Sequence, residues 1–389
     1  MAAYRRFNLW LLGLRGKTLA DVSEQRIVSG QAWEEFCDTL KAAGAALTFP
    51  GAPADAFNQA EGYRYLTRLA RAGLEAYVEF NDPTAPVLNR VVHETVKMGS
   101  DNPDNYYQNA AISGEYEYRI SGNRGTVHYL GFGTQKGSYG QSGGMPPTGY
   151  IEASELEIAE DGTFELWVSC EKKSGNWLPM EPESGTLIVR QTFKDRVGEK
   201  IAALRIERIG SDGQPVFDPQ PVTAKSIDDG LNVASTLVAG ASILFAKWAR
   251  DFQKHVNELP MFDQETSNKA GGDPNIVYYH SYWRLAADEA LVIDAMPPEC
   301  ETWNFQLDNH WMESLDYRYY QIHVNKHTAH YRADGSVQIV VAHEDPGVPN
   351  WINTVGHDCG AMSFRWIRAS EHPQPRCKVM KLAELRAQQ

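Results

Sequence analysis

The sequence predicts a mainly β protein with helical segments, in which two repeated β units are joined by a long helix. Apolar residues alternate with a period of two over residues 105–209 and again over 277–368, as in half-buried strands. Between them, residues 223–258 have the helical period of an apolar stripe. A motif that occurs once in each β region is the third observation, and it favours two copies of one unit.

Residues 1–100 are expected to form an N-terminal helical region. Apolar residues at helical spacing predict a helix over residues 29–45. A second helix is predicted to begin near Asn58, because Asn58 and Glu61 have the spacing of a capping box.

Residues 101–220 are expected to form the first β unit. Asp161 and Gly162 indicate a hairpin turn. The glycine-rich stretch Gly131–Gly149 lacks the spacing and the strand–turn–helix context of a dinucleotide-binding loop, so it is predicted to be a long loop. Four segments read as strand candidates: EYEYRISG, GTVHYLGF, ELEIAEDGTFELWVS and GTLIVRQTF.

A connecting helix over residues 221–262 is expected to lead into a second β unit over residues 263–389. Pro260 marks the end of the helix. The apolar run Leu237–Ala246 is far shorter than the roughly 20 residues of a membrane span, so we expect no contact with a membrane. Asp334 and Gly335 indicate another hairpin turn.

The repeated motif follows both Asp-Gly pairs. It reads DGTFELWVSCEKKSGNWLPMEPESGTLIVR in the first β region and DGSVQIVVAHEDPGVPNWINTVGHDCGAMSFR in the second. The offset between the copies drifts slightly, as insertions in surface loops would produce. Because the motif occurs twice, we interpret it first as a brace of the fold.

Each position that the two copies of the motif share has a structural interpretation. Asn176 and Asn350 are expected to bond local backbone in a turn, next to tryptophan rings that fill a corner between sheets. Gly185 and Gly360 suit close approach or a positive φ. The matched strand ends carry Arg190 and Arg365.

Composition excludes some classes of function. The 389 residues carry a formal net charge of −13, which argues against nucleic-acid binding through phosphates. Five scattered cysteines without a CxxC pair indicate neither a disulfide framework nor a zinc ribbon, so a cytoplasmic location is expected.

The second β region resembles a known family. The segments ADEALVIDAMPPECETWNFQLDNHWMESLDYR, IHVNKHTA, DGSVQIVV and NWINTVGHDCGAMSFRWIRA resemble the domain of unknown function 1214 (DUF1214), which often follows the domain of unknown function 1254. The resemblance covers roughly residues 280–370. It implies jelly-roll-like β-sandwich units, a homo-oligomer, and a role near the bacterial catabolism of steroids and aromatic compounds.

Polar residues are densest in the segment DNHWMESLDYRYYQIHVNKHTAHY, residues 308–331. On one strand, His310, Ser314 and Asp316 would share a face, but strand neighbours lack the geometry of a Ser-His-Asp triad and no GxSxG elbow is present. A turn within the segment is the alternative. His323 and His327 would suit a metal site on a strand, although surface or hydrogen-bonded histidines are the favoured interpretation.

The second region also provides acid–base candidates. We expect His357, found in one copy of the motif only, to act as acid or base with Glu313 or Asp316 as its partner. Asn309 or Arg365 would hold an oxyanion or a carboxylate, and the alternative for Arg365 is a buried brace. Residues expected to contact the substrate here are Trp311, Tyr317 and His310.

In the first β region, a set of aromatic and polar residues is expected to line a pocket for a ring-shaped ligand, with the glycine-rich loop as its lid. These residues are Tyr106, Tyr107, Asn109 and His128. Ordinary sandwich core is the alternative.

These expectations lead to the hypothesis of an enzyme without a cofactor, of lyase or hydrolase type, that acts by acid–base chemistry on a small ring-containing aromatic or steroid-like compound. The first alternative is a non-catalytic jelly-roll protein that binds a ligand or a glycan. The second alternative is a metalloenzyme with histidine ligands.

Overall fold

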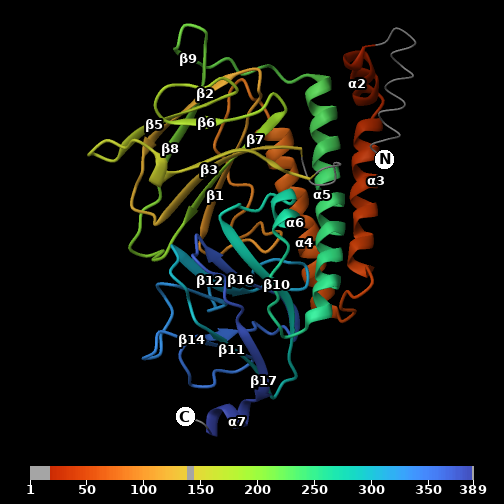
Figure 1. The fold of residues 1–389 in the computed structure, drawn as a ribbon. Coiled ribbons are helices and arrows are strands. Elements are labelled where there is room, and N and C mark those ends of the chain that lie inside the picture. Colours follow the sequence, from red (N-terminus) through yellow and green to blue (C-terminus); the bar gives the residue numbers. More distant parts are fainter. Residues whose placement is uncertain (1–17, 138–143, 388–389) are drawn as a thin grey trace.

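The computed structural model describes residues 18–137 and 144–387, and over these the chain is mainly β, with four sheets and one long helix (Figure 1). Helices α3, α4 and α5 lie side by side and flank the β regions. The bounds of the helices are α2 Leu19–Val28, α3 Gln31–Ala43, α4 Ala56–Leu74, α5 Ala224–Phe252, α6 Gln264–Lys269 and α7 Leu382–Ala387.

Helix starts follow local capping chemistry. The N-cap of α4 is Asp55, whose side chain accepts hydrogen bonds from the backbone and the side chain of Asn58. The predicted N-cap at Asn58 was therefore wrong, because the helix begins about one turn earlier. Thr223 and Ser226 form a capping box at the start of α5. The side chains of α5 that face α3 and α4 are buried, as its apolar stripe predicts.

By length and composition, the helical segment Ala224–His255 could cross a membrane, with a mean hydropathy of 1.3. Core helices of soluble proteins pass the same test, and 56% of the tested window is buried inside the protein. The finding is therefore weak evidence for a membrane, and the expected absence of membrane contact stays a prediction.

The first β region contains two sheets. One has the strand order β1-β7-β3-β4 and the other β6-β5-β2-β8-β9. The pairs are antiparallel, except that β6 runs parallel to β5. The strands are β1 Asn105–Ala111, β2 Glu117–Asn123, β3 Tyr129–Lys136, β4 Pro147–Glu152, β5 Thr163–Ser169, β6 Trp177–Pro179, β7 Ser184–Thr192, β8 Ala203–Ile209 and β9 Pro215–Val216.

The second β region has sheets of order β10-β16-β12-β13 and β15-β14-β11-β17. If β10 is taken as the counterpart of β1, β11 of β2 and so on along the chain, the two strand orders of the second region match those of β1 to β8 in the first. As in the first region, one pair is parallel, here β15 with β14. The strands are β10 Ile276–Arg284, β11 Glu289–Ala295, β12 Thr302–Leu307, β13 His323–Asn325, β14 Val337–Ala342, β15 Trp351–Asn353, β16 Cys359–Ile367 and β17 Arg376–Lys381.

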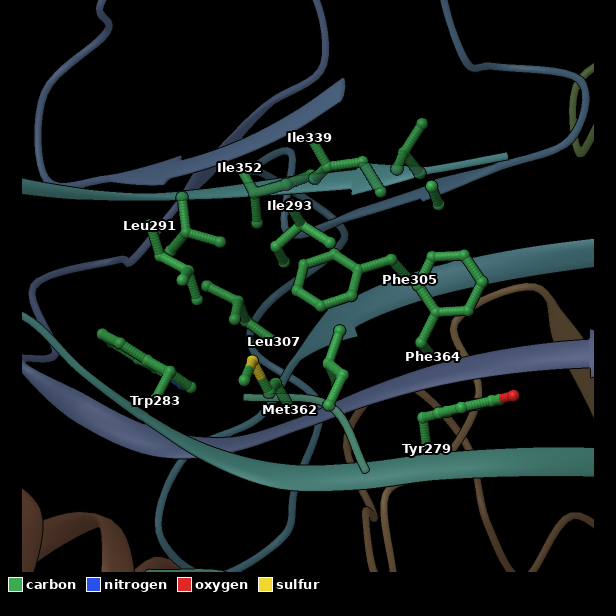
Figure 2. Close-up of a cluster of buried hydrophobic side chains, with 14 of the residues drawn as sticks. Tyr279, Trp283, Leu291, Ile293, Phe305, Leu307, Ile339, Ile352, Met362 and Phe364 are labelled. Carbon is green, nitrogen blue, oxygen red and sulfur yellow. The ribbon is translucent and has the colours of Figure 1, made fainter. Parts of the chain in front are cut away.

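Each β region has its own hydrophobic core between its two sheets, a sandwich-like arrangement. In the second region, Phe305 and Phe364 of one sheet face Ile293 and Ile339 of the other (Figure 2). These side chains are fully buried, and burying one such side chain stabilises the fold by about 1.5–3 kcal/mol. Alternation of apolar residues along the strands therefore identifies the cores correctly.

The Asn-Trp corners form as predicted. Asn176 donates to the carbonyl oxygens of Glu157 and Glu165, and Asn350 donates to those of His330 and Gln338, all at 2.9 Å. Each asparagine also accepts one backbone N–H, and the indole N–H of Trp177 and Trp351 donates to a strand carbonyl nearby. These two amides therefore brace equivalent corners.

The prediction of one long loop over Gly131–Gly149 was wrong. The stretch Gly131–Gly149 is not one loop: β3 extends to Lys136 and β4 begins at Pro147, while residues 138–143, part of the predicted lid, lie outside the described residues. Glycines in β3 were mistaken for strand breakers, although a side chain at Gly131 would collide with the Tyr150 hydroxyl.

The paired glycines of the motif also differ from each other. A Cβ at Gly360 would lie 2.2 Å from the carbonyl oxygen of Asp308, which confirms close approach there. A Cβ at Gly185 would have nothing within 4 Å, and neither residue has a positive φ. The predicted backbone requirement is therefore confirmed for Gly360 and wrong for Gly185.

Candidate functional site

A cavity of about 220 Å³ lies where the two β regions and α5 meet. Its walls come from β1 and β7 of the first region, β10 and β16 of the second, α5, and the segments that precede β1 and β10. Three residues predicted to be functional line it: Tyr107, Asn109 and Arg365.

Arg365 enters the cavity from β16 and is 3% exposed. Its guanidinium donates to the side-chain oxygens of Asn304 at 3.2 Å and Gln306 at 2.5 Å, and to the carbonyl oxygen of Ser100 at 2.6 Å. Among the described residues, no carboxylate lies within 4.0 Å of it. The expected alternative, an Arg–carboxylate brace, is therefore absent there, and the positive charge is held by neutral groups.

Arg190 enters the same cavity from β7, in the first region. One N–H of its guanidinium donates to the carbonyl oxygen of Gly271 at 2.6 Å. Within the described part of the chain, it too lacks a carboxylate within 4.0 Å. Two guanidinium groups without ion-pair partners therefore share one cavity.

The two arginines occupy matching register positions. Tyr107 of β1 pairs with Arg190, and Tyr278 of β10 pairs with Arg365. Each tyrosine hydroxyl accepts a backbone N–H, from Asn102 at 3.2 Å and from Asp273 at 3.4 Å respectively. Burial raises the pKa of both phenols, that of Tyr278 to about 12, so both keep their protons at neutral pH and can donate them.

His280 lies two residues beyond Tyr278 on β10 and also lines the cavity. It is 7% exposed, its ring stacks against Tyr278 and Phe252, and its Nδ1 has no hydrogen-bond partner within the described chain. Burial first, and the nearby charge of Arg365 second, lower its pKa to about 3. The imidazole is therefore neutral at pH 7, and one of its ring nitrogens can accept a proton.

The rest of the cavity wall is largely apolar. Phe245 and Trp248 of α5 contribute aromatic rings, and Ile188 and Ile276 contribute aliphatic surface from the two β regions. A few polar groups converging on an apolar wall are typical of a small-molecule site.

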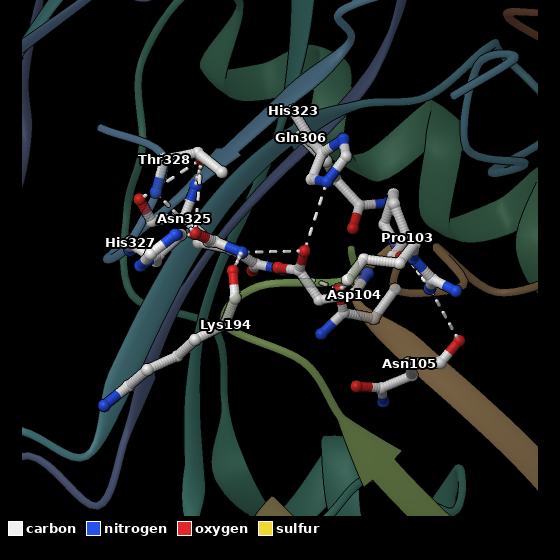
Figure 3. Close-up of polar contacts among 12 residues, drawn as sticks. Pro103, Asp104, Asn105, Lys194, Gln306, His323, Asn325, His327 and Thr328 are labelled. Atoms are coloured by element: carbon white, nitrogen blue, oxygen red, sulfur yellow. Dashed lines mark hydrogen bonds and ion pairs between the residues drawn. The ribbon is translucent and has the colours of Figure 1, made fainter. Parts of the chain in front are cut away.

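The segment before β1 holds the two β regions together beside the cavity. Buried Asp104 accepts hydrogen bonds from the amides of Asn304 and Asn325 at 2.9 Å and contacts His323 at 3.1 Å (Figure 3). Burial alone would raise the pKa of Asp104, but the charge and hydrogen bond of His323 and the amide hydrogen bonds outweigh it and lower that pKa. This ionised carboxylate fixes the first region against β12 and β13.

Two predicted catalytic residues, Asn309 and Glu313, contact each other away from the cavity lining. Glu313 is fully buried and accepts from Arg68 of α4 at 2.6 Å and from Asn309 at 2.9 Å. Asn309 also accepts the backbone N–H of Trp311. They lie in a turn, not on a strand, so the alternative of a turn in this segment holds.

His357, His310 and Trp311 are buried outside the cavity lining. His357 bonds the carbonyl oxygen of Thr354 at 3.0 Å, and its Nε2 has no partner among the described residues. His310 bonds the Tyr282 hydroxyl at 2.8 Å, and the Trp311 indole donates to the Asn58 carbonyl. Burial lowers the pKa of both histidines.

The other predicted residues are spread over the surface of the two regions. Asp316 forms a two-point ion pair with Arg318 at 2.8 and 2.9 Å, which lowers its pKa. Tyr317 lies under the ammonium group of Lys97. Tyr106 packs beneath the Arg90 guanidinium, and the His128 imidazole lies 3.4 Å from Glu301.

The described residues contain no group of three or more His, Cys, Asp or Glu side chains arranged to hold a metal ion. Strand β13 ends at Asn325, so His327 does not continue the strand face of His323, and the geometry assumed for a histidine metal site was wrong.

Sequence reasoning missed His280, Tyr278 and the functional potential of Arg190. The alignment of the two motifs already paired Arg190 with Arg365, and extending it to the preceding strands would have paired Tyr107 with Tyr278 and Asn109 with His280. The sequence therefore contained the correspondence between these residues. It did not show that β10 and β1 line the same cavity, because that depends on how the two β regions pack.

Comparison with known families identifies one part of the chain. Residues 288–371 match the model of a family described as a protein of unknown function (DUF1214). The chain contains a DUF1214 domain. The matched part of this DUF1214 protein includes Arg365, whereas Arg190 lies outside it.

The DUF1214 chain is 50% identical to an uncharacterized protein from Burkholderia cenocepacia of known crystal structure, with a TM-score of 0.90 over 92% of this chain and 99% of that one. It is also similar to the VPA0106 protein from Vibrio parahaemolyticus, with 12% identity and a TM-score of 0.45 over 82% of this chain and 98% of that one. Comparison with curated proteins gives no match.

Proposed function

We propose that this DUF1214 protein is an enzyme that needs no cofactor, of lyase or hydrolase type, and that it uses acid–base chemistry on a small ring-containing compound in the central cavity. The observation that carries the proposal is His280: a neutral, buried imidazole that lines a largely apolar cavity, and whose enclosed Nδ1 has no hydrogen-bond partner among the described residues. A positioned imidazole is the commonest general acid or base in enzymes.

The neighbours of His280 support an acid–base role. Tyr278 and Tyr107 are protonated donors in the same cavity, so they can hydrogen-bond an oxygen on which negative charge develops. Arg365 adds a fixed positive charge. Ring surfaces on α5 suit a cyclic substrate. The roles predicted for His357, Glu313, Asn309 and Asp316 stay predictions without support from the cavity.

We further propose that the two β regions are copies of one jelly-roll-like unit. Support comes from the matching strand orders, the equivalent asparagine corners and the matching Tyr–Arg register pairs. A site at the junction of two such units would draw on equivalent strands from both, as the cavity walls do. A cytoplasmic homo-oligomer remains part of this proposal.

Exchange of hydrogen for deuterium tests the acid–base proposal. Single-ring compounds with an acidic C–H bond, such as phenylacetate, phenylpyruvate and cyclohexanone, would be incubated with the protein in D₂O and analysed by mass spectrometry for incorporation and conversion. We expect protein-dependent incorporation for at least one compound, lost in His280→Asn by at least the 10²-fold typical of a general base.

His357→Asn is the matched comparison, because His357 is the buried histidine that the sequence favours. If His357→Asn abolishes incorporation and His280→Asn does not, the acid–base role moves to His357 and the cavity assignment fails. If the folded wild-type protein neither exchanges nor converts any compound that it binds, the enzymatic proposal fails.

A second candidate function is non-catalytic binding of a glycan on the second β region. Tyr317, Tyr319, Tyr320 and Trp351 line a separate groove, and Tyr319 is 74% exposed. Exposed aromatic faces beside polar groups are the feature that this alternative predicts. An oligosaccharide that binds the wild-type protein and not Tyr319→Ala, with no dependence on His280, would favour it.

A further inference from the structure

The substrate class can be argued from the charge balance of the central cavity. Buried cations are ordinarily paired with carboxylates, because desolvation of a lone charge is costly. Arg68 follows this rule with Glu313. Buried Arg365 and half-buried Arg190 do not: their hydrogen-bond partners among the described residues are carbonyl and amide oxygens, which orient a guanidinium without neutralising its charge.

Two acidic groups beside the cavity are already engaged. Asp101 lines the cavity, but its carboxylate accepts the backbone N–H and the hydroxyl of Ser314, at 3.0 and 2.8 Å. Buried Asp273 accepts the Tyr129 hydroxyl at 3.0 Å. Burial alone would lower the pKa of Arg190, and the more distant charge of Asp273 raises it, but neither carboxylate lies within 4.0 Å of either guanidinium. Both guanidiniums therefore lack a contact ion pair, and an external anion can provide one.

The donors around these guanidiniums suit a carboxylate. Most N–H groups of Arg190 have no acceptor among the described residues, and a planar guanidinium fits a carboxylate through two parallel hydrogen bonds. The Tyr107 and Tyr278 hydroxyls accept backbone N–H groups, so their own protons are available to a ligand oxygen.

The size of the cavity limits the rest of the ligand. An engineered cavity of about 150 Å³ binds benzene, so about 220 Å³ is enough for one ring with a small acidic substituent. Phe245 and Trp248 offer the ring surface on the α5 side.

We infer that the cavity binds a single-ring carboxylate, with its carboxylate between Arg190 and Arg365 and its ring against Phe245 and Trp248. The inference rests on the proposed function, because only an enzyme would make this ligand a substrate. The bound anion also offsets the charge of Arg365, which helps to lower the pKa of His280, and so moves that imidazole toward a working range.

Calorimetric titration with benzoate tests the inference, with benzamide as its neutral isostere and phenyl phosphate as the competing anion class. We expect benzoate to bind, benzamide to bind at least tenfold more weakly, and Arg190→Gln to weaken benzoate at least tenfold. Arg190→Gln is the chosen variant because it removes one hydrogen bond to the described residues, whereas Arg365→Gln removes three. Arg332→Gln, at an exposed ion pair with Asp294, is the control and leaves binding unchanged.

Equal binding of benzamide, or benzoate binding that is unaffected by Arg190→Gln, overturns the inference, and so does tighter binding of phenyl phosphate. The two proposals fail separately. If benzoate binds through Arg190 but no compound exchanges deuterium, the carboxylate site stands and the enzyme falls. If only neutral ring compounds exchange, without need of Arg190, the enzyme stands and the carboxylate class falls.

Discussion

Asp308 offers a quantitative test of the buried polar network, because its carboxyl group is fully buried at the end of β12. Its Oδ1 accepts the Gln306 amide at 2.6 Å, and its Oδ2 has no partner among the described residues. Burial is the largest cause of a rise in its pKa from 3.8 to about 7. The perturbation is Asp308→Asn, a neutral side chain of the same shape.

The sign follows from proton binding. Between pH 4 and 7 the folded state holds a proton on Asp308 that the unfolded state has lost, so stability falls as pH rises through this window. A shift of about 3 pKa units corresponds to about 4 kcal/mol, the full loss above pH 7. For a protein of 389 residues, that is on the order of 5 °C in melting temperature.

The assay is the melting temperature of the wild-type protein and Asp308→Asn from pH 5 to pH 8.5. Other titrating groups are shared, so the difference between the two proteins isolates Asp308. We expect the melting temperature of Asp308→Asn to gain on that of the wild-type protein from pH 5 to about pH 7, and the difference to level off above that pH. Any effect of the new amide that does not depend on pH shifts the difference in melting temperature by the same amount at every pH. Parallel curves would refute the assignment of a protonated, buried Asp308.

Three further predictions use matched pairs and thermal or urea unfolding. Glu313→Ala leaves Arg68 buried without its partner and should cost about 3–5 kcal/mol, whereas Asp316→Ala, at a partly exposed ion pair, should cost at most about 1 kcal/mol; equal costs would contradict the burial argument. Gly360→Ala places a Cβ 2.2 Å from a backbone oxygen and should cost at least about 1–3 kcal/mol, while Gly185→Ala should stay within about 0.5 kcal/mol. Asn350→Ala and Asn176→Ala each remove three hydrogen bonds. Asn350→Ala should lower the free energy of unfolding by about 1 kcal/mol more than Asn176→Ala, because Asn350 is more buried. The reverse order would count against the corner as a buried brace.

Local patterns in the sequence predicted those parts of the fold that local physics determines. Period-two alternation located most strands, the helical stripe located α5, and the asparagine corners bond as expected because their partners lie within twenty residues. Gly131 of β3 misled the prediction, because an added Cβ there would lie 2.9 Å from the Tyr150 hydroxyl, a contact that sequence spacing does not reveal.

The candidate site was less accessible to sequence reasoning. Glu313 was predicted to be a catalytic carboxylate because nothing in the sequence reveals its ion-pair partner. That partner, Arg68, lies 245 positions away, on α4. His280 attracted no attention, because a histidine in an aromatic strand is ordinarily core. Only the packing of β10, β1 and α5 against one another makes it a cavity residue.

The two aligned arginines show how a repeated motif can serve both the fold and a site. Arg190 of the first β region bonds the carbonyl oxygen of Gly271, five residues before β10, and Arg365 of the second bonds that of Ser100, five residues before β1. Both carbonyl-bearing residues have a positive φ.

Each arginine therefore reaches across the junction to the equivalent position of the other region, and the bonds are reciprocal. A brace confined to one region would need only partners in that region. Because these arginines cross the junction and still keep N–H groups without protein acceptors in the described chain, the same two residues can join the β regions and hold an anion between them. On this argument, a ligand that bridges both guanidiniums also strengthens the junction, so benzoate should raise the melting temperature of the wild-type protein more than that of Arg190→Gln.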